Sequence, residues 1–237
     1  MAQVFHRSMN AVARITVFGL PLMLVGAALS GTIIYRSGYI TGQNQVIDQP
    51  VPFSHKHHVG QLGIDCRYCH TSVETSAFAG VPPTKTCMNC HQQMWAGSEM
   101  LNPVRESYKL NKSIPWERVH NLPGYVYFNH SIHIAKGVGC VSCHGQVDDM
   151  ALMSQAKPLL MEWCLKCHRN PEEHLRPRDE VTSMTWQPGD YVHPETSKKE
   201  NPDTGKPYTQ AELGKKLKEP HKVRDALTIT SCSMCHR

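Results

Sequence analysis

Aromatic residues and β-strand patterns are both scarce in this chain. Phe, Trp and Tyr make up 7% of its 237 residues. Runs that alternate Val, Ile or Thr with polar residues, which are typical of half-buried strands, hardly occur. With 16 Gly and 16 Pro, the chain also has little signal for long regular elements. The sequence therefore predicts a mostly irregular fold with short α-helices.

No cysteine lies outside one five-residue pattern, C-x-x-C-H, which occurs five times and uses all ten cysteines. The cysteine pairs are Cys66 and Cys69, Cys87 and Cys90, Cys140 and Cys143, Cys164 and Cys167, and Cys232 and Cys235. The histidines that follow them are His70, His91, His144, His168 and His236. Cysteines at positions i and i+3 share one face of a helical turn, and the next residue turns its imidazole onto that face. In this pattern two thiols add to the vinyl groups of haem and the histidine ligates the iron, so the sequence predicts five covalently bound haem c groups.

Three other uses of paired cysteines were weighed: a disulfide framework, zinc sites and a thioredoxin-like redox pair. None of them requires a histidine directly after every pair. Histidine occupies 15 of 237 positions. Five pairs would therefore all precede histidine by chance only about once in a million cases. The spacing favours haem attachment over the other three.

The chain is short for the number of haems that it is predicted to hold. About 200 residues follow the N-terminal apolar segment, or roughly 40 per haem, which is a small allowance for a protein core. We therefore expect the haems themselves to form the core. The predicted fold is that of a multihaem cytochrome c wrapped around five haems, in which the porphyrins supply flat apolar surface.

The formal charge of +5 could indicate a nucleic-acid or acidic-lipid partner. A ferric haem with neutral axial ligands and two ionised propionates carries a charge of about −1, so five haems would bring the loaded protein to roughly neutral. We interpret the excess of Lys and Arg as balancing the propionates. The sequence therefore predicts no nucleic-acid partner.

A single long apolar stretch, residues 15–35, lies between Arg14 and Arg36 and contains no charge. Its length suits a helix that spans a bilayer. A cleaved signal peptide is the alternative, because residues 28–30 could serve as a cleavage site. The apolar run continues past that site, which favours an uncleaved transmembrane anchor at 15–35 with a cytoplasmic tail at 1–14. Haem c is attached outside the bacterial cytoplasmic (inner) membrane, so we expect a single-pass protein whose haem domain lies on the periplasmic side.

The chain contains an internal repeat. The segment FSHKHH precedes the motif at Cys66, and FNHSIH precedes the motif at Cys140. Each copy is followed by a second haem motif, at Cys87 or at Cys164. The repeat predicts a first dihaem module at 36–118 and a second dihaem module at 119–170. A polar connection and the C-terminal fifth haem would then occupy 171–237.

The shared pattern F-x-H-x-x-H resembles the start of the cytochrome c3 and c7 class of multihaem cytochromes. In that class the first histidine is the distal ligand of the adjacent haem, and the second histidine reaches a different haem. The resemblance implies four distal ligands, His55, His58, His130 and His133. His55 and His130 would cap the irons held by His70 and His144, and the other two would cap two other irons. His57 breaks the spacing and is expected to face solvent.

One distal ligand is left to assign. His120, in WERVHNLPGYVYF, is the first choice. Three methionines compete with it, namely Met150, Met153 and Met161, although methionines at such spacing more often pack in a core. A His/Met haem would have a raised potential. The histidines of the polar C-terminal region are expected at the surface: His174, His193 and His221.

Over its whole length the sequence resembles the pentahaem cytochrome c subunit of bacterial alternative complex III, a quinol-oxidising complex. The matching stretches are FSHKHH, VHNLPGYVYFNHSIH, MEWCLKCHRNP and SCSMCHR, together with the single anchor. The resemblance implies a non-catalytic electron-transfer subunit. Electrons would come from quinol oxidised in an integral membrane subunit, through partners that include an iron–sulfur subunit. They would leave toward a monohaem cytochrome c or a terminal oxidase.

Two enzymatic functions were considered beside electron relay. A pentahaem reductase of nitrite or a similar oxyanion needs an iron with an open position, typically at a C-x-x-C-K motif, whereas all five motifs here end in His. A self-sufficient multihaem quinol dehydrogenase usually has its first haem motif soon after the anchor, whereas Cys66 lies well beyond Arg36. The supply of additional histidines favours irons with two side-chain ligands and thus electron transfer.

Overall fold

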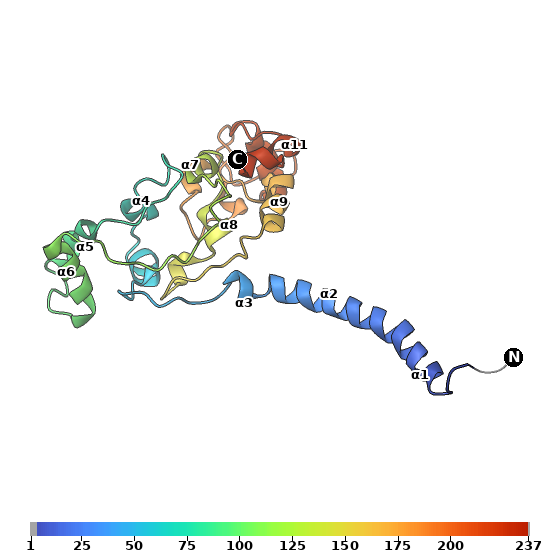
Figure 1. Ribbon diagram of the computed structural model, residues 1–237. Helices are drawn as coiled ribbons and strands as arrows, with labels where there is room; N and C mark the ends of the chain where they lie inside the picture. Colours follow the sequence, from blue (N-terminus) through green and yellow to red (C-terminus); the bar gives the residue numbers. More distant parts are fainter. Residues whose placement is uncertain (1–3, 237) are drawn as a thin grey trace. The chain divides into compact units, whose positions relative to one another are not determined.

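The computed structural model describes residues 4–236, and the chain divides into two units after Gln43. The N-terminal unit is dominated by one helical stretch, Met9–Arg36, of 28 residues (Figure 1). It comprises α1 (Met9–Arg14), the π-helical turn η1 (Ile15–Gly19) and α2 (Leu20–Arg36), followed by α3 (Gly38–Thr41). Its most apolar window has a mean hydropathy of 2.0 and no buried residue. By length and composition this helix could cross a bilayer, and it contains the predicted segment 15–35.

The second unit consists of short helices joined by irregular segments, as the composition predicts. Its α-helices are α4 (Cys66–Cys69), α5 (Thr84–His91), α6 (Asn102–Leu110), α7 (His130–Ala135), α8 (Cys140–His144), α9 (Met161–Arg169), α10 (Gln210–Lys218), α11 (Ala226–Ile229) and α12 (Cys232–Cys235). Single turns are the π-helical η2 (Lys56–Gln61) and the 3₁₀-helical η3 (Glu99–Leu101), η4 (Val147–Asp149), η5 (Pro171–Glu173), η6 (Arg178–Glu180) and η7 (Pro188–Asp190). Within residues 44–236, β pairing is limited to two isolated bridges, Val46 with Ser154 and Val138 with Leu175. The predicted mostly irregular fold with short helices is confirmed.

All five C-x-x-C-H motifs begin on helices, namely α4, α5, α8, α9 and α12. We number them sites 1 to 5 in chain order, so site 1 holds Cys66, Cys69 and His70, and site 5 holds Cys232, Cys235 and His236. The residue before each of these helices is extended, for example Asp65 with φ −64° and ψ 143°. Helical geometry therefore begins close to the motif, which places both cysteines of a pair on one turn.

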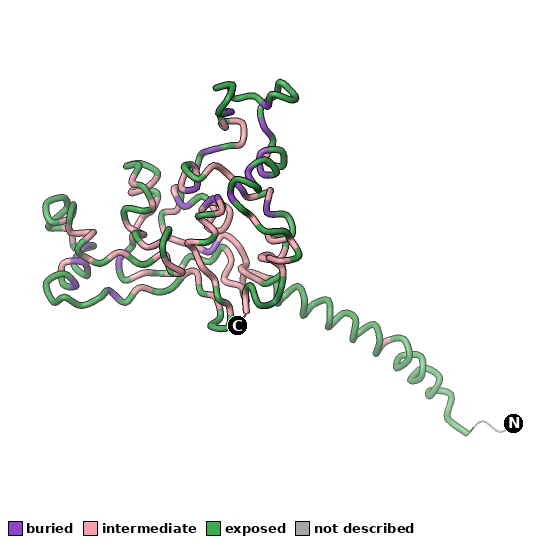
Figure 2. The backbone as a smooth tube through the Cα atoms, turned by 90° about the horizontal axis from the view of Figure 1, so that it is seen from above, coloured by how far each residue is buried: buried purple, intermediate pink, exposed green. Residues whose placement is uncertain are grey.

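Apolar side chains are buried in two small clusters, and Figure 2 shows buried backbone in short separate stretches. The first cluster contains Val51, Leu101, Val104 and Ile114, and Cys87 packs against it. The second contains Leu175, Trp186, Tyr208, Leu213 and Leu217. The second cluster lies entirely in the region that the sequence predicts as a polar connection. That region therefore has an apolar core of its own, in addition to any surface that haem would cover.

The prediction that the C-terminal histidines lie at the surface is wrong for two of them. His193 and His221 are each 6% exposed, and His174 is half-buried. The Nδ1–H of His221 donates to the carbonyl oxygen of Lys136 at 3.0 Å, which ties the end of α10 to the loop before site 3. His193 lies in a folded loop, where its Nδ1 accepts a hydrogen bond from the backbone N–H of Glu195. Local hydrogen bonds allow these polar rings to be buried.

Candidate functional site

None of the ten cysteines is joined to another by a disulfide. Burial raises the pKa of Cys143 to about 11 and that of Cys167 to about 12, and it also raises the pKa of Cys69, Cys87 and Cys164. The hydrogen bond with Cys140 lowers the pKa of Cys66 to about 7. Redox-active and zinc-binding cysteines work as thiolates with lowered pKa values. For these five thiols with raised pKa values, burial favours the neutral form, and Cys66 is the exception.

Four of the motif histidines are oriented by backbone carbonyl groups. The Nδ1 atoms of His70, His91, His168 and His236 lie 2.6, 3.1, 2.8 and 3.1 Å from the carbonyl oxygens of Gly80, Met94, Ile229 and Tyr125. A carbonyl oxygen can only accept, so Nδ1 must carry the proton. The lone pair is then on Nε2, which is the arrangement found in metal-bound histidines.

Three of the histidines expected as distal ligands have the same orientation. The Nδ1–H groups of His58, His130 and His133 donate to carbonyl oxygens at 2.8, 2.8 and 2.7 Å. For His58 and His133 the acceptor lies four residues earlier in the chain, whereas His130 donates to Ala77 of the first module. These rings also present Nε2 as the free electron-pair donor.

Motif histidines and additional histidines form facing pairs. The ring centroids are 6.1 Å apart for His58 and His91, with an interplanar angle of 64°, and 6.2 Å apart for His133 and His168, with an angle of 25°. For His130 and His144 the distance is 6.4 Å and the rings are nearly parallel, at 10°. A metal ion between two imidazoles, with metal–nitrogen distances of about 2 Å, holds the ring centroids about 6 Å apart. The residues present therefore fit an iron held between each pair.

His55 is placed near His70, but their relationship is less direct. Burial, followed by the influence of His70, lowers the pKa of His55 to about 4. Its buried Nδ1 has no hydrogen-bond partner. A neutral imidazole at this position keeps an electron pair available for a metal.

Phe53 and Phe128 hold the histidines of the two repeats in the same way. Phe53 stacks on His58 with ring centroids 4.3 Å apart and meets His55 edge-on at 4.9 Å. Phe128 stacks on His133 at 4.6 Å and meets His130 edge-on at 4.7 Å. The sequence repeat is therefore also a repeat of side-chain packing.

The two repeats exchange hydrogen bonds reciprocally. The N–H of Lys56 donates to the carbonyl oxygen of Met150 at 2.9 Å, and the N–H of Ser131 donates to that of Ser76 at 3.2 Å. Lys56 and Ser131 both directly follow the first histidine of F-x-H-x-x-H, and Met150 and Ser76 stand at the same position after their haem motifs. Each repeat thus pairs with the segment that follows the other repeat's motif. This is the contact pattern of a pseudo-two-fold interface.

Contacts between cysteines order the five sites in space. Equivalent residues of the repeat meet at the centre, where the thiols of Cys66 and Cys140 are hydrogen-bonded. Cys69 interacts electrostatically with Cys87, Cys143 with Cys164, and Cys164 with Cys235. These contacts connect the sites in the order 2–1–3–4–5. Cys90 and Cys232, the two cysteines classed as exposed, belong to the two ends of this series.

His120 lies beside site 3. Its ring centroid is 4.4 Å from that of His144 at an interplanar angle of 69°, and its buried Nε2 has no partner. Burial lowers its pKa, with a further contribution from His130. Of the competing methionines, Met161 is 63% exposed, and the side chain of Met150 lies near Gly145. The distal ligand of the fifth haem therefore stays a prediction.

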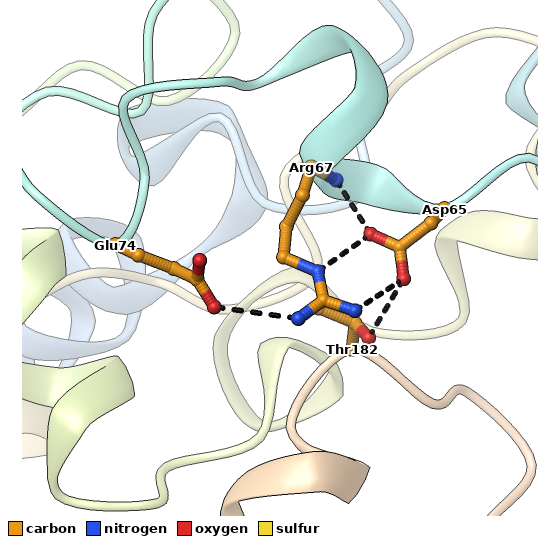
Figure 3. A network of polar contacts seen from close by, with 4 residues as sticks. All are labelled: Asp65, Arg67, Glu74 and Thr182. Atoms are coloured by element: carbon orange, nitrogen blue, oxygen red, sulfur yellow. Dashed lines mark hydrogen bonds and ion pairs between the residues drawn. The ribbon is translucent and has the colours of Figure 1, made fainter.

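His57 differs from the sequence interpretation. Several charged groups near the sites were not predicted from the sequence. His57, expected to face solvent, is half-buried and stacks on Trp95 with ring centroids 5.9 Å apart. Beside site 1, the carboxylate of Asp65 forms two hydrogen bonds of 2.9 Å with the guanidinium of Arg67 (Figure 3). Beside site 3, the guanidinium of Arg176 lies 5.0 Å from the ring centroid of Trp186. Asp65 could have been noticed because it directly precedes Cys66, whereas Arg176 has no local signal.

No protein-family model matches the chain. A curated protein of Nitratidesulfovibrio vulgaris (strain Hildenborough), "Menaquinone reductase, multiheme cytochrome c subunit", is 32% identical over 149 residues. The match covers 54% of this chain and 70% of that protein. Together with the five motif helices and the facing histidine pairs, this similarity decides the class of protein. The chain belongs to the same family of multihaem cytochrome c subunits.

Proposed function

We propose that this chain is the electron-transfer subunit of a quinone-linked membrane oxidoreductase and that it carries five covalent haem c groups. The facing histidine pairs are the main support. Where Nε2 atoms approach an iron from both sides, no coordination position is open for a substrate. Such a site can exchange electrons but cannot perform bond chemistry on nitrite or another small oxyanion.

The placement of the side chains supports the proposed ligands. The cysteines of sites 1 to 5 would form the thioether bonds, and the motif histidines would be the proximal ligands. The distal ligands would be His55 at site 1, His58 at site 2, His130 at site 3 and His133 at site 4. One distal ligand is left, for which His120 is the first candidate from the sequence and the three methionines are the alternatives. Because the ring of His120 lies 4.4 Å from that of His144, it is closer to site 3 than this assignment to site 5 would require. A bound haem supplies reversible one-electron transfer at its iron.

The spatial order of the sites supports a linear relay. Electrons would pass between neighbouring sites in the order 2–1–3–4–5, or in reverse. The exposed cysteines Cys90 and Cys232 are at the terminal sites, so we propose that these two sites exchange electrons with partners. The thiols of the intervening sites are half-buried, which suits transfer within the protein.

The direction of electron flow distinguishes two partner arrangements. The resemblance to alternative complex III favours electrons that originate in a quinol-oxidising integral membrane subunit and an iron–sulfur subunit. They would end on a monohaem cytochrome c or a terminal oxidase. The named activity of the Nitratidesulfovibrio relative favours the opposite direction, toward menaquinone. We propose the first and keep menaquinone reduction as the second candidate.

We also propose that the helix Met9–Arg36 remains as a membrane anchor. Its exposed apolar surface supports this proposal, because such a surface is costly in water and is covered in a bilayer or by partner helices. The haem unit would then lie on the periplasmic side of the bacterial cytoplasmic membrane.

The test is extraction of native membranes in mild detergent, followed by a native gel stained for haem and for quinol-dependent dye reduction. A high-mass band with covalent haem on this chain and quinol activity is expected. A small band that oxidises quinol alone would instead establish a self-sufficient quinol dehydrogenase. Nitrite turnover, or rapid carbon monoxide binding by most of the reduced haem, would overturn the relay. Faster menaquinone reduction than quinol oxidation by the isolated complex would favour the second candidate.

A further inference from the structure

Sites 1 and 3 are equivalent in the repeat, yet opposite charges lie beside them. The residue before the first cysteine is Asp65 at site 1 and Gly139 at site 3. Asp65 caps α4 by accepting a hydrogen bond of 2.8 Å from the N–H of Arg67. Gly139 has no side chain, and the guanidinium of Arg176 fills the space beside it. A Cβ atom added to Gly139 would lie 2.5 Å from Nε of Arg176.

The group of charges at site 1 has a net negative charge. Arg67 is shared between two carboxylates, Asp65 at 2.9 Å and Glu74 at 3.4 Å (Figure 3). Thr182 donates a further hydrogen bond to Asp65 at 3.2 Å and adds no charge. One cation and two anions leave a formal charge of −1.

The charge at site 3 is a half-buried cation. The Nη1 atom of Arg176 donates to the carbonyl oxygens of Ser183 at 2.7 Å and Glu180 at 3.3 Å. These acceptors are neutral, and no carboxylate of residues 4–236 forms an ion pair with Arg176. Among its electrostatic neighbours, Cys140 has the larger influence, and the carboxylate of Glu180 also interacts with the guanidinium without forming an ion pair with it. Site 3 therefore has a cation with no directly paired carboxylate, whereas at site 1 two carboxylates share one guanidinium.

One segment, residues 176–182, contacts both sites and fixes the positions of both charges. It contributes Arg176 beside site 3 and Thr182 beside Asp65, and between them the carbonyl oxygen of Val181 accepts from the N–H of Cys140 at 3.0 Å. The aromatic face of Trp186 lies under the guanidinium. These contacts hold the guanidinium in a fixed position beside site 3.

We propose that Asp65 and Arg176 make the two central haems unequal, with a higher reduction potential at site 3 than at site 1. This proposal rests on the proposed function, because it requires haem at both sites. A reduced haem carries one more negative charge than an oxidised haem, so a nearby cation stabilises the reduced form and a nearby anion disfavours it. The repeat places the two sites in corresponding positions, and these side chains add a difference in charge between them. The asymmetry favours electron transfer from site 1 to site 3, and hence from the first module toward site 5.

The experiment is a redox titration of the purified full-length protein in detergent, monitored by haem absorbance and by electron paramagnetic resonance. Arg176→Gln removes the cation, and Arg176→Lys keeps it. Asp65→Asn removes the anion but keeps a good helix cap, and Asp65→Glu keeps the charge. Lys199→Gln is the control, because Lys199 is an exposed surface cation paired with Asp190.

We expect Arg176→Gln to shift one of the five transitions to lower potential and Asp65→Asn to shift a different transition to higher potential. The charge-conserving variants and Lys199→Gln should titrate like the parent protein. Unchanged potentials, shifts of the opposite sign, or a shift of the same transition in both variants would overturn the inference. If Arg176→Gln loses haem, the remaining variants still test the proposal. An unchanged titration of Asp65→Asn would contradict it, and so would a shifted titration of Arg176→Lys.

Haem content separates this inference from the proposed function. Peptide masses should show haem on both Cys66/Cys69 and Cys140/Cys143 in the parent protein. Haem missing from either pair would contradict the proposed function, whatever the potentials. A full haem complement with unchanged potentials would leave the relay intact and reject only the charge asymmetry.

Discussion

The imidazole rings of His133 and His168 face each other with centroids 6.2 Å apart and an interplanar angle of 25°. They come from different helices, α7 and α9, and each is fixed by a hydrogen bond from Nδ1 to a backbone carbonyl oxygen. Backbone acceptors cannot be removed by side-chain substitution, which makes the orientation of both rings robust. The space between them is suited to one metal ion with two nitrogen ligands.

Replacing His133 should therefore open one iron without removing its haem. In His133→Ala, both cysteines of site 4 and His168 remain, so the number of haems per chain should not change. One haem in five should become high-spin and should bind carbon monoxide when reduced. Absorbance and electron paramagnetic resonance spectra would measure both changes. His57→Ala is the control, because the structure places that ring on Trp95 rather than opposite a motif histidine. Unaltered spin states in His133→Ala would reject this assignment.

The burial of His221 predicts a structural role that differs from iron ligation. His221→Ala should lose the hydrogen bond to Lys136 and lower the free energy of unfolding by about 1–3 kcal/mol, because the carbonyl oxygen loses its partner in a buried place. The melting temperature should fall while the haem spectrum stays unchanged. A spectrum with one high-spin haem would instead identify His221 as the distal ligand of an iron.

Gly60 is a sensitive point of the contact between the repeats. A Cβ atom there would clash with the carbonyl oxygen of Asp148, which is backbone and cannot rotate away. Gly60→Ala should force η2 away from η4 and reduce stability by about 1–3 kcal/mol, as measured by thermal unfolding. Gly97→Ala is the matched control, since nothing lies within 4 Å of its added Cβ. Equal melting temperatures for the two variants would contradict the prediction.

The core of the C-terminal region should contribute to stability independently of the haems. Leu213 is fully buried, at 0% exposure, so Leu213→Ala should lower the free energy of unfolding by about 2–5 kcal/mol through lost burial and a cavity. Chemical denaturation followed by tryptophan fluorescence would measure the change. Glu195→Ala, at an exposed position, should have little effect. A stable Leu213→Ala protein would mean that haem contacts, rather than this cluster, hold the region together.

The proposed membrane anchor can be tested by a charge at its centre. Leu24→Arg should weaken membrane insertion by about 2.5–3.5 kcal/mol, and alkaline carbonate should then release more of the chain. Ser8→Arg lies before the apolar stretch and should behave like the parent protein. If carbonate also releases the parent chain with its haem, the helix is not an anchor.

Local patterns in the sequence predicted local structure correctly. The spacing of Cys66 and Cys69, or of Cys140 and Cys143, predicts a helical turn, and each pair lies on one. The scarcity of strand patterns predicts the irregular fold. The distal-ligand assignments of His55 and His130 stay predictions, since they depend on a bound group. The spacing did suggest residues that the structure places near motif histidines.

Long-range relationships were not predictable from one sequence. The contact between Cys66 and Cys140 depends on how two modules pack, and no periodicity records it. Leu175, Trp186 and Tyr208 converge from a segment dominated by turn formers, so their common burial has no helical or strand spacing to reveal it. His221 looked like a surface residue for the same reason, because its acceptor, Lys136, is remote in the chain.

The hydrogen bonds from Lys56 to Met150 and from Ser131 to Ser76 have a consequence for biosynthesis. The first repeat cannot complete its backbone pairing until the ribosome has produced the chain as far as Met150. Cys66, Cys69, Cys87 and Cys90 therefore belong to an unfinished structure while synthesis continues. We therefore expect the early thiols to remain accessible for haem attachment until the second repeat has been made.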